Sequence, residues 1–195
     1  MIQIIDYKSG NIRSVENALN KLNQQYEVID SPDKLKDNAK VIFPGVGAAG
    51  SAMKILKEKD FDKAIPKIKT PFLGICLGMQ LLLENSEEDN AKCLGIIKGN
   101  VKKFPNSVKT PQIGWNKVQQ TKADSLFMDI YDDNYFYFVN SYYTDVGNQN
   151  VLGRTDYGSS FASVIKKDNF YGVQFHPEKS GDIGFKLLNN FCKLC

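Results

Sequence analysis

The chain has 195 residues, of which 42% are hydrophobic and 24% charged, a composition typical of globular proteins. This length predicts a single domain, residues 1–195, that buries its core without disulfide bonds. The 25 basic and 22 acidic residues are interleaved and leave a net charge of only +3, which argues against a nucleic-acid-binding protein.

We expect no targeting segment and no metal site at the ends of this sequence. An acid at position 6 interrupts the first apolar stretch, so no signal peptide is expected, and no apolar run approaches the length of a membrane span. We therefore expect a cytoplasmic protein without membrane contact, in which thiols stay reduced. Cys192 and Cys195 have C-x-x-C spacing, but no second pair completes a zinc site, and we expect neither a metal nor a cofactor.

The first half alternates apolar runs with helical periodicity. The runs predict strands at residues 2–5, 26–29, 41–43 and 71–75, with a turn at Ser31-Pro32. Apolar residues at helical spacing predict helices at residues 11–22, 49–59 and 77–85. This order predicts an α/β fold, with a mostly parallel central sheet flanked by helices on both faces.

The second half is richer in aromatic and β-branched runs that lie between turns. These runs predict antiparallel or mixed strands that extend the sheet, at residues 118–120, 135–139, 151–155, 162–165 and 171–175. A final helix is predicted at residues 184–192.

Cys76 stands where an apolar strand meets a helix, in the sequence Gly74-Ile75-Cys76-Leu77-Gly78. This is the cysteine form of the G-x-S-x-G turn, in which small neighbours let strand and helix approach and a strained backbone presents the nucleophile. The free N–H groups of the following helix would favour a thiolate over a thiol. A buried core cysteine is the alternative explanation.

The only histidine of the chain, His176, follows a predicted strand in the segment His176-Pro177-Glu178. In an extended segment, residues i and i+2 point the same way, so the Glu178 carboxylate can bind one ring nitrogen and leave the other for a thiol. Alone, the segment is more typical of a surface histidine beside a solvated glutamate. Combined with Cys76, it predicts a nucleophile, a base and an orienting carboxylate.

The loop at residues 45–50 contains the pattern G-x-G-x-x-G between a strand and a helix. A dinucleotide site would also need an acid near the end of the next strand, but that strand ends at Cys76. We therefore favour another role, in which backbone N–H groups near Gly47 join the Leu77 N–H in an oxyanion hole. A plain strand-to-helix turn is the remaining alternative.

These segments resemble the class I (triad) glutamine amidotransferases and, more narrowly, the glutaminase subunits of imidazole glycerol phosphate synthases. The resemblance covers nearly the whole chain. Its matching segments are GNIRSV (10–15), PGVG (44–47), GICLGMQ (74–80), GWN (114–116) and FHPEKS (175–180).

The resemblance implies a flavodoxin-like α/β fold and hydrolysis of L-glutamine to glutamate and ammonia through a cysteine thioester. It also implies a heterodimer with a (β/α)₈-barrel synthase, which uses the ammonia to make imidazole glycerol phosphate and AICAR in histidine biosynthesis. The catalytic residues would be Cys76, His176 and Glu178. The oxyanion hole would use Gly47 and Leu77, with Val46 as a further candidate. Substrate would contact Gln80, Asn140, Ser141 and Tyr142, and the partner would contact Asn11, Arg13, Trp115, Asn116 and Lys179.

Four positions in three segments depart from the usual family pattern. Gln112-Ile113 replaces a histidine and methionine, Asn140 replaces a histidine, and Lys8 replaces a glycine. None of them belongs to the triad, so they bear on the partner and the ammonia acceptor. Two alternatives follow. One is a paralogous glutaminase that supplies another amidating enzyme, such as one modifying a surface sugar. The other is a non-hydrolytic thiol sensor or partner-stabilising subunit.

Overall fold

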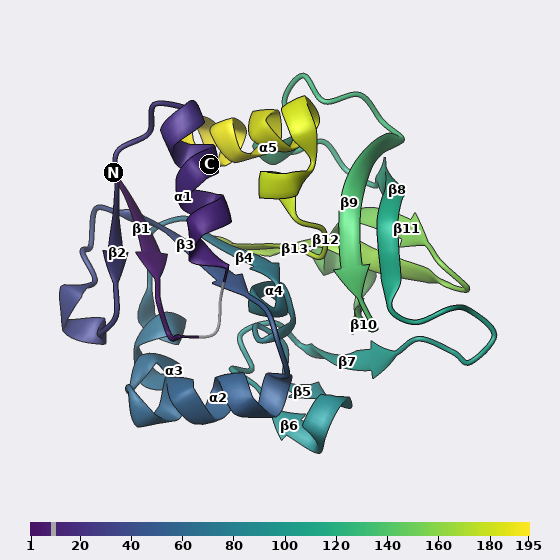
Figure 1. Ribbon diagram of the computed structural model, residues 1–195, viewed down its shortest axis with the longest axis horizontal. Coiled ribbons are helices and arrows are strands. Elements are labelled where there is room, and N and C mark those ends of the chain that lie inside the picture. The colour runs from purple at the N-terminus through teal and green to yellow at the C-terminus, as the bar shows by residue number, and fades with distance from the viewer. Residues whose placement is uncertain (9–10) are drawn as a thin grey trace.

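The computed structural model describes residues 1–8 and 11–195. Gly10, which belongs to the first matching segment, lies outside the described residues. A single twisted sheet runs through the molecule, in the order β2-β1-β3-β4-β13-β12-β10-β7-β5-β6 (Figure 1). Three further strands, β11, β8 and β9, continue from β12 as a branch.

The N-terminal part of the sheet is parallel, as predicted. Each neighbouring pair from β2 to β13 runs in the same direction. The bounds of these strands are β1 Ile2–Ile5, β2 Tyr26–Ile29, β3 Lys40–Gly45, β4 Phe72–Cys76 and β13 Phe170–Val173.

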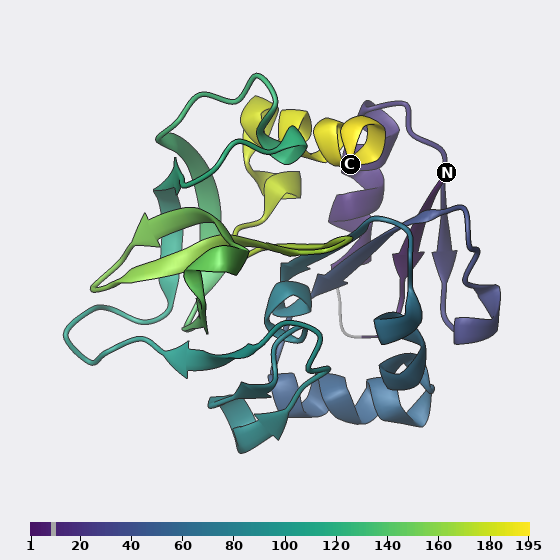
Figure 2. The ribbon, with the colours of Figure 1, turned by 180° about the vertical axis from the view of Figure 1, so that it is seen from behind.

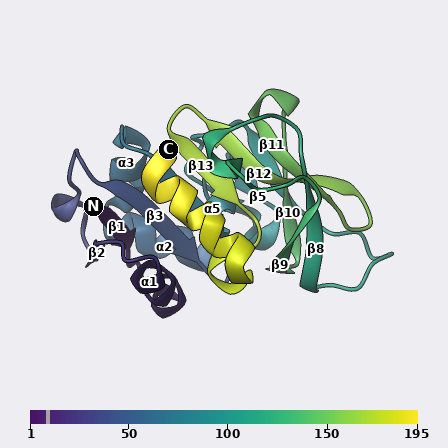
Figure 3. The same ribbon diagram turned by 90° about the horizontal axis from the view of Figure 1, so that it is seen from above.

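Helices cover both faces of this parallel region, and the strands present apolar side chains to each face. Helices α1 and α5 lie on one face and α2 and α3 on the other (Figures 1 and 2). Viewed from above, α5 crosses over the central strands beside α1 (Figure 3). The helix bounds are α1 Ile12–Lys21, α2 Ala49–Glu58, α3 Phe61–Ala64, α4 Leu77–Gln80 and α5 Gly181–Leu194.

The period-two alternation of the strands explains the two layers. On β3, Ile42 packs into the cluster that contains α1 and α5, whereas Val41 and Phe43 pack into the cluster that contains α2 and α3. All three side chains are fully buried or nearly so. Strands buried on both faces are expected for a parallel sheet that is covered by helices on each side.

Strand β13 joins the two halves of the sheet, because it is parallel to β4 and antiparallel to β12. Beyond it the pairing is mostly antiparallel, with one parallel pair, β5 with β7. The bounds are β5 Asn85–Ser86, β6 Ala91–Lys92, β7 Gly99–Lys103, β8 Gln112–Gln120, β9 Asn134–Asn140, β10 Tyr142–Val146, β11 Val151–Asp156 and β12 Ser160–Lys167. Six short 3₁₀ turns complete the regular structure of the described residues: η1 Pro32–Lys34, η2 Ile65–Lys67, η3 Glu88–Asn90, η4 Ser125–Phe127, η5 Asn148–Asn150 and η6 Pro177–Lys179.

The predicted fold class is confirmed, but the helix predicted at residues 77–85 is wrong. Helix α4 ends at Gln80, and Asn85 already belongs to β5. Leu81, Leu82 and Leu83 are all fully buried, and their carbonyls accept hydrogen bonds from backbone N–H groups at positions 94–97. These carbonyls are therefore held by a neighbouring loop and do not continue a helical ladder.

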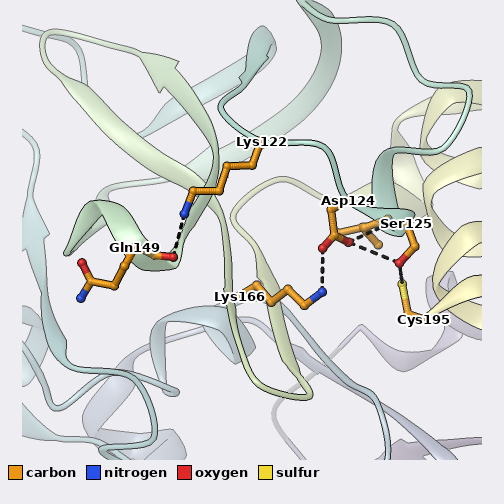
Figure 4. Close-up of polar contacts among 7 residues, drawn as sticks. Lys122, Asp124, Ser125, Gln149, Lys166 and Cys195 are labelled. Carbon is orange, nitrogen blue, oxygen red and sulfur yellow. Dashed lines mark hydrogen bonds and ion pairs between the residues drawn. The ribbon is translucent and has the colours of Figure 1, made fainter.

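Local contacts fix the C-terminal helix and its two free cysteines. The Cys195 sulfur lies 3.4 Å from the Ser125 hydroxyl, and the neighbouring Asp124 carboxylate accepts a 2.6 Å bond from Lys166 of β12 (Figure 4). In the same view, Lys122 donates a hydrogen bond to the Gln149 carbonyl, a contact apart from the helix.

Burial raises the pKa of the Cys192 thiol to about 11, so this thiol stays protonated at neutral pH.

Candidate active site

Three strand ends bring the predicted catalytic segments to one edge of the sheet. Strands β3, β4 and β13 are parallel neighbours, so their carboxyl ends meet, with Gly45 paired to Cys76 and Ile75 paired to Val173. Ligands of open α/β sheets bind at such carboxyl ends. The Gly-rich loop, Cys76 and His176 all lie at or just beyond these ends.

Cys76 has the strained backbone that the G-x-C-x-G pattern predicts. Its φ and ψ angles are 54° and −110°, a conformation that non-glycine residues rarely adopt. The sulfur-bearing residue is 8% exposed, at the junction of β4 and α4. Because α4 is a single turn, any stabilisation of a thiolate by this helix is smaller than a full-length helix would provide.

The glycines around Cys76 permit close packing of the turn against β3. A Cβ atom on Gly78 would lie 1.9 Å from the Phe43 carbonyl oxygen, and one on Gly74 would lie 2.6 Å from the Gly78 oxygen. Both distances are shorter than any real contact of a Cβ atom. The sequence pattern around Cys76 is therefore required by the local backbone geometry.

His176 and Glu178 face one another across Pro177. The His176 Nδ1 and Glu178 Oε1 atoms are 2.8 Å apart, and both side chains are almost completely buried. A carboxylate at Nδ1 fixes the tautomer of the ring and leaves Nε2 to contact the Cys76 sulfur. Burial acts to lower the pKa of His176, but hydrogen bonds to Cys76 and Glu178 outweigh it and raise that pKa to about 10.

A chain of buried amides leads to the Cys76 sulfur. Gln80 donates from Nε2 to the Tyr142 carbonyl at 3.1 Å and to Gln174 Oε1 at 2.9 Å. Gln174 in turn donates from Nε2 to the Cys76 sulfur at 3.7 Å. Asn140 donates to the same Tyr142 carbonyl at 2.9 Å, and its buried Oδ1 has no hydrogen-bond partner among the described residues.

A pocket of about 270 Å³ opens beside the sulfur. Of the predicted residues it brings together the nucleophile, the base, the oxyanion-hole candidates and the proposed substrate contacts. Its lining comprises Val46, Gly47, Cys76, Leu77, Gln80, Glu88, Pro111, Val139, Asn140, Ser141, Tyr142, His176 and Lys179. Glu178 is absent from this lining because it packs behind the imidazole.

Glu88 lines the pocket but was not singled out in the sequence. Its Oε2 accepts a 2.9 Å hydrogen bond from the Ala49 N–H, in the first turn of α2. Burial raises the pKa of this carboxyl, the bond from Ala49 opposes the shift, and the Asp89 charge adds to it. In the sequence, Glu88 lies in the acidic run Glu87-Glu88-Asp89, which is typical of a solvated loop, so only the tertiary structure identifies it.

The five residues predicted to contact a partner come from three parts of the chain, the start of α1, strand β8 and turn η6. Trp115 is 55% exposed, packs edge-on against Tyr137, and lies over Gly181 next to the loop of Lys179. Asn11 and Arg13 are exposed at the start of α1. The Asn116 side chain is engaged within the protein, where it donates a hydrogen bond to the Asp156 backbone carbonyl at the end of β11.

Within residues 1–8 and 11–195, no group of three or more His, Cys, Asp or Glu side chains could hold a metal ion. Over the same residues, no helix has the length and apolar character needed to cross a membrane. The Gly-rich loop lies next to Cys76 in the wall of the pocket. The next long strand along the chain, β4, ends at Cys76 and not at an acidic residue. The dinucleotide alternative therefore lacks its ribose-binding acid.

A model of the family described as "Glutamine amidotransferase class-I" matches residues 3–194. The chain belongs to this family. Two curated relatives match over the full length of this chain. A protein of Methanocaldococcus jannaschii is 48% identical, with 100% of each chain covered, and one of Dehalococcoides mccartyi is 44% identical, with 100% of this chain and 97% of the relative covered. Both are named imidazole glycerol phosphate synthase subunit HisH.

Solved structures share the class I glutamine amidotransferase fold at much lower identity. PurLQS from Thermotoga maritima matches with a TM-score of 0.78 at 19% identity, covering 97% of this chain and 96% of that one. A crystal structure of a glutamine amidotransferase matches with a TM-score of 0.75 at 16% identity, covering 97% and 98%. These likenesses support the fold alone.

Proposed function

We propose that this chain is the glutaminase subunit of an imidazole glycerol phosphate synthase and that Cys76, His176 and Glu178 are its catalytic triad. The observation that carries the proposal is that Cys76 and His176 line the same pocket, while the Glu178 carboxylate lies 2.8 Å from His176 Nδ1. The full-length relatives named HisH favour histidine biosynthesis over a paralogous amidation. A thiol sensor would need neither the His176–Glu178 pair nor a pocket for an amino acid.

The pocket offers complementary groups to both ends of glutamine. Gln80 uses both of its amide hydrogens within the protein, so its carbonyl oxygen is the group left to accept an N–H of the substrate. Glu88 supplies a carboxylate for the substrate ammonium group. Asn140 Oδ1, buried and without a partner among the described residues, can accept from the carboxamide N–H or from departing ammonia.

The reaction follows from the position of the sulfur. The Cys76 thiolate attacks the side-chain carbonyl carbon of glutamine, and the electron pair of that carbonyl moves to oxygen. Backbone N–H groups of Gly47 and Leu77, or of Val46, bind this oxyanion, a contribution of about 3 kcal/mol per donor in comparable enzymes. Leu77 begins α4, so helix geometry leaves its N–H free for such a ligand.

His176 then gives its Nε2 proton to the leaving nitrogen, ammonia departs, and a thioester to Cys76 remains. Water then attacks the thioester while the neutral imidazole removes a proton from that water. Glutamate is released, and the thiolate–imidazolium pair is restored. Glu178 keeps the ring in one tautomer and stabilises the imidazolium throughout.

The ammonia requires an acceptor protein, which we propose to be a (β/α)₈-barrel synthase docked at the mouth of this pocket. Trp115 and Ile113 are exposed on β8, and Val139, the residue on β9 that pairs with Ile113, lines the pocket. Large aromatic side chains exposed in this way often dominate binding energy at interfaces. Lys179, beside the pocket, and Asn11 and Arg13, at the start of α1, would contact the partner, and Asn116 would support the Trp115 strand.

The decisive experiment is to measure glutamate and ammonia release from glutamine by the purified chain and by the Cys76→Ala variant. We expect the variant to lose activity and to keep its unfolding midpoint, and Cys93→Ala serves as the matched control for a buried cysteine elsewhere. Undiminished release by Cys76→Ala would reject the glutaminase proposal. Glutamine hydrolysis should accelerate when an imidazole-forming barrel is added and should not change with other amidating enzymes. This comparison separates histidine biosynthesis from a paralogous amidation.

A further inference from the structure

Gln174 is completely buried and its amide links two functional groups of the pocket. It is 0% exposed, and it lies on the segment between β13 and His176. Burying an amide in a protein core is costly unless its polar atoms are hydrogen-bonded. Both of its side-chain polar atoms are bonded here, one to the sulfur of Cys76 and the other to Gln80.

The network determines which way the Gln174 amide points. The Tyr142 carbonyl can only accept, so Gln80 must present its NH₂ group to it. The second hydrogen of that NH₂ group then points to Gln174 and requires an acceptor there, which is Oε1. The Gln174 NH₂ group is consequently directed at the Cys76 sulfur, where it can donate but not accept.

This donor opposes another group near the same sulfur. The Val139 carbonyl lies 3.8 Å from Sγ and accepts a hydrogen bond only from the protonated thiol. The Gln174 N–H lies at 3.7 Å and is a better partner for the charged thiolate, since hydrogen bonds to ionised groups are the stronger ones. The sulfur therefore lies between one group that can only accept a hydrogen bond from it and one that can only donate to it.

We propose that Gln174 is a positioning residue that holds the Cys76 sulfur in its charged form and at the same time orients the Gln80 amide that faces substrate. The proposal rests on the glutaminase function, because it assigns Gln174 a part in that reaction. It predicts that nucleophile reactivity and substrate affinity are coupled through one amide.

Two variants separate the two roles. Gln174→Met keeps the size of the side chain but can neither donate to the sulfur nor accept from Gln80. Gln174→Glu still accepts from Gln80 but places a carboxylate beside the sulfur. We expect both to move the pH profile of Cys76 alkylation upward, by about one pH unit for the methionine variant, which is about tenfold in thiolate population. The glutamate variant should show the larger shift and the smaller increase in KM.

The test uses the full chain with iodoacetamide as the probe, and the alkylated Cys76 peptide is quantified by mass spectrometry across pH. Gln3→Met is the matched control, since Gln3 is also 0% exposed and, among the described residues, its amide bonds to Glu27, Lys34 and Lys36, away from the pocket. It should lose stability but keep the native alkylation profile. Native profiles in both Gln174 variants would overturn the proposal.

If neither Gln174 variant folds, Gln80→Glu tests the same claim from the other end of the network. A carboxylate at position 80 cannot donate to Gln174 Oε1, so the Gln174 amide must rotate and turn its carbonyl toward the sulfur. Slower alkylation is then expected, and an unchanged profile would overturn the proposal. Because alkylation requires no glutamine, a failure of the glutaminase proposal is seen separately, in the hydrolysis assay of Cys76→Ala.

Discussion

Glu178 Oε1 lies 2.8 Å from His176 Nδ1, although only one proline separates the two residues in the chain. The second carboxylate oxygen, Oε2, is buried and has no hydrogen-bond partner among the described residues. Among the described residues, the Glu178 carboxylate is therefore bonded through Oε1, to the imidazole. An arrangement of this kind makes the charge state of His176 sensitive to Glu178.

We expect Glu178→Gln to reduce kcat for glutamine hydrolysis by about 100-fold, a typical contribution of acid–base catalysis. The pKa of His176 is raised to about 10, against the opposing effect of burial, by its bonds to Cys76 and Glu178, so removing the carboxylate charge lowers it. The imidazolium that protonates ammonia then disappears at a lower pH. The high-pH decline of kcat should move to lower pH, which a pH series of initial rates measures.

Asp182→Asn is the control for this change, because Asp182 is exposed on the first turn of α5. It should leave the pH profile in place. An unshifted high-pH limb in Glu178→Gln would show that the carboxylate does not act on the imidazole.

Glu88→Gln should increase KM for glutamine by tenfold or more, with a smaller change in kcat, because a charge-assisted bond to the substrate ammonium is lost. The raised pKa of Glu88, caused first by burial, means that its carboxylate is protonated at a higher pH than usual. In the native chain, KM should therefore increase as the pH falls through the weakly acidic range. Asp89→Asn is the control, since Asp89 also caps α2, at the Gly50 N–H, but does not line the pocket. Equal KM effects in the two variants would assign Glu88 to helix capping alone.

Gly78→Ala should destabilise the fold by about 3 kcal/mol, because its Cβ would lie 1.9 Å from a backbone oxygen of β3 and one of the two segments must move. Gly95→Ala is the comparison. Gly95 has a φ of +66° but no atom within 4 Å of a Cβ, so only the left-handed backbone costs energy, about 1 kcal/mol. Urea denaturation measures both. Similar losses would mean that the turn around Cys76 is not tightly packed.

Strong periodic patterns and two motifs predict most of this molecule, and the failures have physical causes. Both the parallel core and the turn at Cys76 follow from local sequence, because buried strands and small residues leave clear patterns. Strand β7 was not predicted because Val101 is its only buried residue, and β10 because its inward residue is Thr144. Their positions depend on strand pairing, which single-sequence patterns do not record.

The same limit applies to the pocket. Gln174 and Glu88 have functional contacts only because residues far apart in sequence meet them, 98 positions away for Gln174 and Cys76 and 39 for Glu88 and Ala49. A glutamine between Val173 and Phe175 is otherwise an ordinary polar residue at the end of a strand. The sequence motifs point to Cys76 and His176, whereas the contacts of Gln174 and Glu88 follow only from the tertiary structure.

Trp115→Ala should weaken binding of the barrel partner by about 30-fold, in the range expected when an aromatic residue at the centre of an interface is removed. The indole is 55% exposed and touches Tyr137 only edge-on, so the free energy of unfolding of the isolated chain should change little. Tyr131→Ala is the matched control, because Tyr131 is 87% exposed in the loop before β9 and away from the pocket lining. Titration calorimetry with the barrel protein measures both affinities. Loss of affinity in the Tyr131 variant and none in the Trp115 variant would place the partner on a different face of the protein.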